Sequence, residues 1–232
     1  MSLISTVMGS SPRWLAIAAA VVAGVSVAGC SGANHDSVGG HLNPETVVVA
    51  NGVESLMIEG GAPATSNLGI EVTPGSGFAV TGSRPGVATI SRRSGGAGAR
   101  HLTVRLSRTQ VWQVIVRGGT TSTALDLSGL MLSQVHVTGG AERLTISLPA
   151  PRGRASLVAV SGGATTVAVD APQGTAIQVA VGPGIARGVV VGADFVSNGA
   201  PRVFLVGSYA GAPDSYSVQL TAGASRLVVS EP

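Results

Sequence analysis

The chain has 232 residues, of which 34 are glycine, 3% are aromatic and 11% are charged. It has no lysine, so arginine supplies all 14 basic side chains against 11 acidic ones, and the formal net charge is +3. With 44% apolar residues and few charges, the composition excludes a disordered chain, which combines low hydrophobicity with high charge. A single cysteine also excludes an internal disulfide framework.

The N-terminal segment has the pattern of an export signal. Arg13 precedes an apolar run over residues 15–28, and small residues lead from that run into Cys30. The run is shorter than the roughly 20 residues that a membrane-spanning helix needs. The sequence Val27-Ala28-Gly29-Cys30 resembles the lipobox of bacterial lipoproteins.

The lipobox resemblance implies a maturation route and a location. A signal peptidase would recognise Val27, Ala28 and Gly29, remove residues 1–29 as a helical signal peptide, and leave Cys30 carrying diacylglycerol and a further acyl chain such as palmitate. The polar residues 30–43 would then be a flexible tether at the outer face of the cell membrane. The alternatives are an uncleaved anchor or an ordinary secretory signal. The absence of lysine suggests codon bias in a GC-rich, actinobacterial genome.

Charge is segregated along the chain. Residues 30–71 carry five acids and no arginine, whereas residues 72–125 carry seven arginines and no acid. Such a basic segment would be attracted to an anionic surface or partner. Alternatively, acidic and basic strands lie side by side and neutralise each other. The residues proposed for partner contact are Arg84, Arg92, Arg93, Arg100 and Arg105.

Beyond Pro44 the pattern predicts strand after strand, forming one all-β domain over residues 44–232. Two apolar runs flank Asn51-Gly52, a dipeptide that predicts a β-hairpin. No stretch has a convincing 3.6-residue apolar period, and glycine is too frequent for helices.

An internal repeat organises this domain. A strand with strict alternation follows several Gly-Gly units: Leu144, Ile146 and Leu148 would face inward while the residues between them face outward. A Pro and Gly break and a second strand then follow, at residues 155–160 and 177–181. The units are Gly60-Gly61-Ala62, Gly95-Gly96-Ala97, Gly118-Gly119-Thr120, Gly139-Gly140-Ala141 and Gly162-Gly163-Ala164, with a degenerate copy at Ala222-Gly223-Ala224.

Two short strands and two turns cannot bury an apolar face alone, but stacked units can. Glycine at each corner would allow the positive φ or the close backbone approach that a tight coil needs. The repeat therefore predicts a glycine-rich β-solenoid-like stack of short strands. A β-sandwich would use similar patterning and is the alternative.

Residues 112–229 resemble bacterial adhesin-like domains of unknown function, which are glycine-rich and β-solenoid-like. The resemblance implies a non-enzymatic, membrane-attached module, and distant relatives occur in proteins linked to envelope stress. The matching pieces are Trp112-Gln113-Val114-Ile115-Val116-Arg117-Gly118-Gly119, Leu125-Asp126-Leu127-Ser128, Gly139-Gly140-Ala141, Leu148-Pro149-Ala150-Pro151-Arg152-Gly153, Gly162-Gly163-Ala164, Ala171-Pro172-Gln173-Gly174, Asp214-Ser215-Tyr216 and Ala222-Gly223-Ala224-Ser225.

Little in the sequence points to catalysis. His101 and His136 would be lone surface histidines, and no nucleophile elbow is present. Asp126 and Asp170 would approach each other if the coils are in register, which is the basis for a small polysaccharide-acting enzyme as a third hypothesis. We expect no metal and no cofactor other than the lipid on Cys30. Nucleic acid is not an expected partner, because the arginines lack interleaved aromatic residues.

Two non-enzymatic hypotheses remain. In the first, the protein is a lipid-anchored surface module that contacts an envelope protein or a wall polymer through flat, polar faces. In the second, it is a membrane-proximal regulator of an envelope-stress response that uses the basic segment. In both, membrane lipid is contacted through Cys30.

Overall fold

The computed structural model describes residues 5–6, 45–63, 66–94, 100–209 and 212–231. These residues form strands and one 3-10 turn, η2 (Asn67–Gly69), with no α-helix among them, so the all-β class is confirmed. The described part contains no helix long and apolar enough to cross a membrane. The predicted signal helix and tether lie outside the described residues, apart from the two residues of β1 (Ser5–Thr6).

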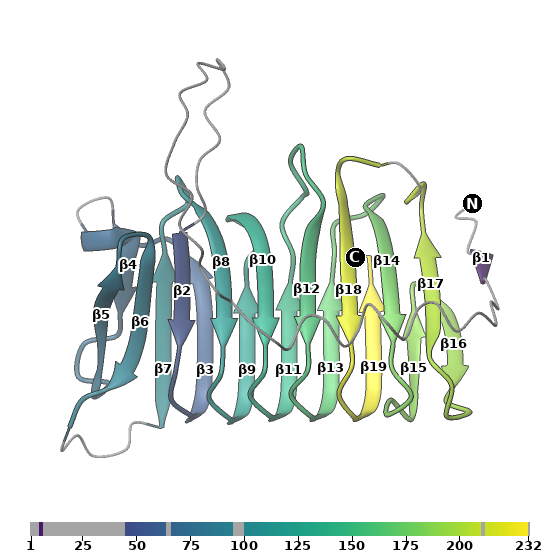
Figure 1. Ribbon diagram of the computed structural model, residues 1–232, viewed down its shortest axis with the longest axis horizontal. Coiled ribbons are helices and arrows are strands. Elements are labelled where there is room, and N and C mark those ends of the chain that lie inside the picture. The colour runs from purple at the N-terminus through teal and green to yellow at the C-terminus, as the bar shows by residue number, and fades with distance from the viewer. Residues whose placement is uncertain (1–4, 7–44, 64–65, 95–99, 210–211, 232) are drawn as a thin grey trace.

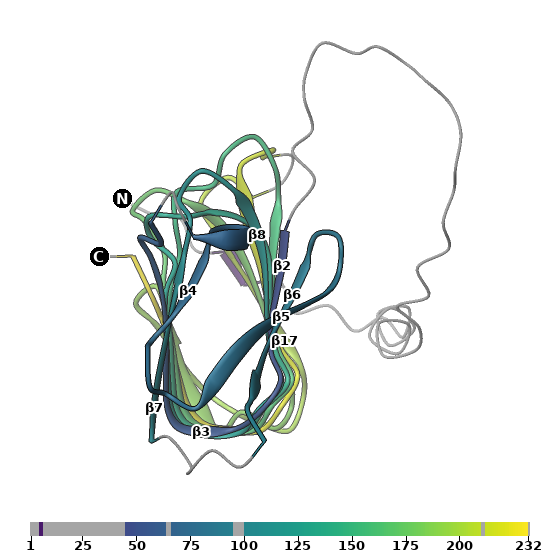
Figure 2. The same cartoon turned by 90° about the vertical axis from the view of Figure 1, so that its left-hand side faces the viewer.

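Two mixed sheets face each other across the core (Figures 1 and 2). The ten-stranded sheet has the spatial order β1, β17 (Arg202–Val206), β14 (Ala176–Val181), β18 (Ser215–Leu220), β12 (Ser156–Val160), β10 (Met131–Val137), β8 (Val111–Val116), β2 (Glu45–Val49), β6 (Val87–Arg92) and β5 (Phe78–Arg84). The nine-stranded sheet has the order β16 (Ala193–Val196), β15 (Arg187–Val190), β19 (Ala224–Ser230), β13 (Ala164–Asp170), β11 (Ala141–Ser147), β9 (Thr120–Asp126), β3 (Val53–Gly60), β7 (His101–Leu106) and β4 (Ile70–Val72).

The chain passes repeatedly from one sheet to the other, and neighbouring strands in the middle of each sheet are parallel. The stack does not follow chain order at its ends. The β2–β3 pair lies between β6–β7 and β8–β9, and the C-terminal β18–β19 pair lies between β12–β13 and β14–β15. Antiparallel strands β4, β5, β16 and β17 complete the two ends. A simple solenoid, in which each coil follows the last, is therefore not established.

The predicted alternation is confirmed in the strands themselves. On β11, Leu144 and Ile146 are buried, whereas Arg143 is exposed. The inward side chains of both sheets form one hydrophobic core cluster that extends from Val47 to Val229. Because these side chains are mostly Val, Leu and Ile, the two sheets are held together by aliphatic packing rather than by large aromatic groups.

Each β8–β9, β10–β11 and β12–β13 corner contains a Gly-Gly pair, and the corners stack directly on one another. A Cβ built on Gly139 would overlap the carbonyl oxygen of Gly118, and one on Gly162 would overlap that of Gly139. None of these three glycines has positive φ, so close backbone approach is the reason for glycine here. Backbone hydrogen bonds then join successive corners, as from Thr120 N to Gly140 O at 2.8 Å.

Two expectations about glycine were wrong. Asn51-Gly52 does not close a hairpin: β2 and β3 belong to different sheets, and neither residue has the positive φ that a type I′ turn requires. The pair forms the same kind of corner as the Gly-Gly units, since Val53 N donates to Gly119 O. Gly60-Gly61 lies at the opposite end of β3 and is not a corner unit. Residues 95–97 lie outside the described residues.

We predict that Gly139→Ala destabilises the fold by about 2 kcal/mol or more, because the new methyl group must push two corner backbones apart. The matched control is Gly140→Ala in the same dipeptide, where the added Cβ would make an ordinary contact of 3.5 Å with Gly163 O. Denaturant unfolding of both variants measures the difference. Equal losses of unfolding free energy in the two variants would contradict the stacked-corner account.

Among the described residues, Tyr216 is the largest fully buried side chain after Trp112, and its hydroxyl donates to Pro149 O at 2.9 Å. Burial raises the pKa of this hydroxyl above its ordinary value. The hydroxyl therefore favours the folded state below about pH 10, where an unfolded tyrosine is still protonated, and this contribution falls as the pH rises further.

We therefore predict that Tyr216 stays protonated above about pH 10 for as long as the fold persists. Phenolate absorbance followed together with circular dichroism tests this. The free energy of unfolding of Tyr216→Phe should be about 1 kcal/mol lower than that of wild type at neutral pH. The variant should also lose less stability than wild type as the pH rises above neutral. Full ionisation of both tyrosines in a still-folded wild type would show that the Tyr216 site is open to water.

Candidate functional site: an arginine edge

The stacked corners bring together arginines that are far apart in the sequence. They lie at the corners themselves, or within the first few residues of the strands of the nine-stranded sheet, and all are exposed. We call this surface the arginine edge. It contains Arg92, Arg93, Arg100, Arg117, Arg143, Arg187 and Arg226.

Strand register sets the spacing of these side chains. Arg143 on β11 and Arg226 on β19 both pair with Thr166 on β13, so they are two strands, or about 9.6 Å, apart. Arg187 precedes Gly188, which pairs with Leu227, and this places Arg187 beside Arg226. Three arginines therefore point outward from one row of the sheet, with Thr166 between two of them.

The other end of the edge is anchored by Arg92. Its guanidinium lies 5.8 Å from the centre of the Phe78 ring and donates to Gly52 O at 3.2 Å, while its backbone N donates to Asn51 Oδ1. Arg92 therefore folds over the β2–β3 corner. Its neighbour Arg93 is exposed at the same end of β6.

Opposing carboxylates are few along this edge. Within the described part of the chain, Arg100 is the one edge arginine with an acid within 4 Å, and its 3.8 Å contact with Glu54 is highly exposed. Exposed pairs of this kind contribute little and are screened by salt. The edge consequently keeps most of its positive charge available to a partner.

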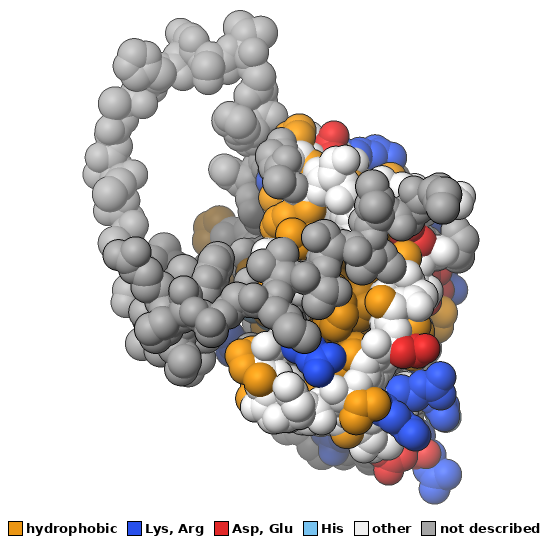
Figure 3. All heavy atoms as spheres, turned by 90° about the vertical axis from the view of Figure 1, so that its right-hand side faces the viewer, with side chains coloured by type: hydrophobic (Ala, Val, Ile, Leu, Met, Phe, Trp, Pro, Cys, Tyr) orange, Lys and Arg blue, Asp and Glu red, His pale blue; other side chains and the backbone are white. Residues whose placement is uncertain are grey.

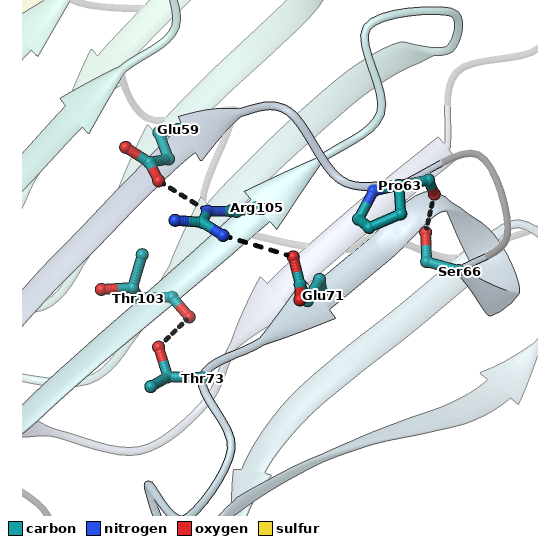
Figure 4. A network of polar contacts seen from close by, with 7 residues as sticks. All are labelled: Glu59, Pro63, Ser66, Glu71, Thr73, Thr103 and Arg105. Carbon is teal, nitrogen blue, oxygen red and sulfur yellow. Dashed lines mark hydrogen bonds and ion pairs between the residues drawn. The ribbon is translucent and has the colours of Figure 1, made fainter.

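The structure separates the five arginines proposed from the sequence. Arg92, Arg93 and Arg100 lie on the arginine edge, whereas Arg84 and Arg105 lie at the opposite ends of β5 and β7. Arg105 is paired there, with Glu59 Oε1 at 2.8 Å and with Glu71 Oε2 at 3.7 Å (Figure 4). The hydrogen bond and charge of Glu59, followed by the charge of Glu71, raise the pKa of Arg105.

Acidic side chains gather at this opposite end of the same sheet face. Asp126 and Asp170 both pair in register with Ser147 and so lie two strands apart, about 9.6 Å. Asp126 Oδ1 accepts a hydrogen bond from Ser128, and Asp170 Oδ1 accepts one from Ser230. Each carboxylate is thus engaged by a serine on an exposed sheet face, and we place no catalytic role on either.

The end of the stack that carries β16 and β17 shows side chains of both charges (Figure 3). Basic side chains gather toward its lower margin, on the side where the corners lie in Figure 1, with acidic side chains among them (Figure 3). Apolar side chains occupy the middle of this end. One of its aromatic contacts joins Phe195 on β16 to Phe204 on β17, with ring centres 5.3 Å apart.

The sequence-based choice of contact residues left out Arg117, although Arg117 belongs to the basic segment. It missed Arg143, Arg187 and Arg226 because they lie outside that segment. The repeat held the necessary signal for two of them. Arg143 follows Gly139 by four positions, and Arg226 follows Ala222 by four positions, so aligning the units would have placed both at one level of the stack. Arg187 has no such unit before it.

Other predicted site residues fall elsewhere. Val27, Ala28, Gly29 and Cys30 lie outside the described residues. In the described part of the chain, no group of three or more His, Cys, Asp or Glu side chains is arranged to hold a metal ion. His101 is exposed and His136 is half-buried, and partial burial lowers the pKa of His136.

No protein-family model and no curated protein matches the chain. Among solved structures, the fold is similar to that of a protein described as "a putative cell adhesion protein" from Clostridium sporogenes ATCC 15579. The TM-score is 0.61 and the identity is 15%, and the match covers 82% of this chain and 94% of that chain. At this identity the likeness shows a shared all-β fold over nearly the whole of the other chain.

Proposed function

We propose that the protein is a lipid-anchored, extracytoplasmic binding module that performs no catalysis and contacts an anionic polymer of the cell envelope. The observation that carries this proposal is the arginine edge, where seven exposed arginines from several strands and corners follow the length of the stack. The adhesion description of the Clostridium protein supports a cell-surface location. We also propose that the parallel strands in the middle of the stack form a β-solenoid.

The chemistry of the edge favours an extended, negatively charged partner. Guanidinium groups bind carboxylate and phosphate through paired hydrogen bonds, and the strand spacing repeats them along a line. A polymer with regularly spaced anions can occupy several arginines at once, so that weak individual contacts add up. A rigid sheet presents these contacts without much loss of conformational freedom on binding.

The point at which the chain enters the described domain favours a polymer over the membrane surface as the partner. Strand β2 begins at Glu45, immediately after the tether, and runs toward the corners. The chain therefore enters the domain at the end of the sheet away from the arginine edge. A lipid on Cys30 would attach the domain through that end, so the arginine edge would be at the end of the domain away from the attachment point.

We predict that Arg143→Ser/Arg226→Ser weakens binding to a polyuronate chain by at least about tenfold, since two charge-assisted contacts are lost. The matched control is Arg152→Ser/Arg154→Ser, which removes the same charge from the exposed loop before β12. Affinity is measured at several salt concentrations, with unfolding curves to show that all proteins are folded. Because exposed residues are exchanged, both variants should unfold within about 0.5 kcal/mol of wild type.

Equal losses of affinity in the two double variants would show that net charge alone determines binding. That result would contradict a localised binding edge. In-cell cross-linking with Arg92→Ser/Arg93→Ser/Arg100→Ser provides the second comparison. Capture of wall polymer that is lost in this variant supports the proposal. Capture of a specific membrane protein, lost in the same variant, would instead favour the regulator of an envelope-stress response.

Lipid anchoring is tested through Cys30. We predict that Cys30→Ala blocks processing, so that the protein accumulates as an uncleaved precursor or is released to the medium. Metabolic labelling with a fatty acid, together with membrane fractionation, measures both effects, and Cys30→Ser serves as the conservative companion. A Cys30→Ala protein that matures normally and stays with the membrane would contradict the anchor.

A further inference from the structure

The two ends of the stack differ in how their terminal strands are protected. At one end, β4 has only three residues, and its Glu71 is paired with Arg105 on β7. The neighbouring terminal strand β5 has a register shift between Gly82 and Arg84 in its pairing with β6. Short strands, charged side chains and bulges discourage pairing with another chain. We call this the protected end.

The other end, formed by β16 and β17, is regular and apolar. Strand β17 pairs with β14 in unbroken register from Arg202 to Val206. Val196 on β16 is 72% exposed and Val203 on β17 is 38% exposed, and apolar side chains occupy the middle of this end (Figure 3). A terminal strand with an apolar sequence and no break in register is a site where another strand can be added.

Strand β1 shows how such a strand is added. Ser5 and Thr6 pair with Leu205 and Phe204, so the outer edge of β17 accepts an antiparallel strand. This contact covers two of the five positions of β17. It also belongs to residues 1–29, whose removal is part of the proposed function. The present inference rests on that removal, after which the whole outer edge of β17 is available.

We propose that a second copy of this chain occupies this edge, with the two β17 strands paired antiparallel across a twofold axis. Such an interface uses the same surface of both copies. A pairing centred on Phe204 sets Val203 opposite Leu205 of the second copy, and the reverse. Apolar side chains therefore meet apolar ones directly across the interface, which is a favourable cross-strand arrangement.

The charges and the core at this end fit a second copy. Strands β16 and β17 carry one acid, Asp194, and one base, Arg202, so they have no net charge that would oppose self-association. Phe195 and Phe204 join the two sheets here, and the Arg202 guanidinium lies 5.9 Å from the centre of the Phe195 ring. The twofold axis keeps each sheet in its own layer, so β16 also faces β16 of the second copy.

The same symmetry is compatible with two lipid anchors in one membrane. The axis of an antiparallel pair of identical strands is perpendicular to the sheet, so the ten-stranded sheets of both copies stay on one side. Both β2 strands, and the predicted tethers that precede them, belong to that side. The exposed Arg143, Arg187 and Arg226 belong to the nine-stranded sheet on the other side. Two joined chains also hold the membrane more firmly than one.

In-cell cross-linking of the full-length protein tests the pairing. With Phe204 on the axis, the two Val203 side chains are diagonal neighbours on the outward face of the sheet, about 7–8 Å apart. A short bismaleimide should therefore join two copies of Val203→Cys. The matched control is Thr81→Cys, at an exposed position on β5 at the protected end of the same sheet. Wild type shows whether Cys30 itself reacts.

Sedimentation measures the dimer without the anchor. The part of the chain used is residues 31–232, which contains every described strand except β1 and the whole core cluster from Val47 to Val229. It should form dimers at about 10 μM. Because this part lacks Cys30, its result does not depend on lipidation.

Lysine variants of the same part separate association from folding. Val203→Lys should raise the dissociation constant of the dimer at least about tenfold, because an ammonium group would then face Leu205 of the second copy. Thr81→Lys adds the same charge at the protected end and should leave the constant unchanged. Both exchanges are at exposed positions, so both variants should unfold at the same denaturant concentration as wild type.

A protein that stays monomeric at about 100 μM would overturn the proposal. So would an unchanged dimer in Val203→Lys, or Thr81→Cys cross-linked as efficiently as Val203→Cys. Cross-linking of Val203→Cys only to a different protein would assign the edge to another partner and also overturn it. Polyuronate binding is measured through Arg143 and Arg226, and lipidation through Cys30, so neither of those results depends on the dimer.

Discussion

Close contact between glycine backbones at the corners is the constraint on which the rest of this structure depends. A side chain at Gly118, Gly139 or Gly162 would overlap the adjacent corner, so the spacing of the parallel strands is fixed where the chain turns. The corner hydrogen bonds continue the sheet ladder around the turn. Aliphatic packing fills the space between the sheets, but the glycines decide how closely the layers can stack.

The same constraint converts a sequence repeat into a surface. Because each corner sits on the next, outward residues at equivalent positions form rows across the nine-stranded sheet. Basic residues occupy the row near the corners, whereas Glu59, Asp126 and Asp170 occupy the far end, where Arg105 is neutralised by two glutamates. The neutralising contacts expected between acidic and basic strands are present at one end, whereas arginines with few opposing acids gather at the other.

Local patterns predicted the local structure well. Alternation on β11 and glycine at the β10–β11 corner could be read from the repeat, because both depend on residues close in sequence. The insertion of β18–β19 between earlier coils could not, since strand pairing over long distances leaves no local signal. The hairpin prediction at Asn51-Gly52 failed for a related reason, because a dipeptide does not specify which sheet the next strand joins.

The central claim is that arginines on separate strands act as one linear surface, and the dependence of affinity on polymer length tests it most directly. From β7 to β15 the nine-stranded sheet has six strand-to-strand steps, about 29 Å. Size-fractionated polyuronate chains should bind more tightly as they lengthen, until they span about 30 Å, after which affinity per chain should rise only slowly. Short units that bind as tightly as long ones would contradict the account, because a single local pocket would then explain the interaction.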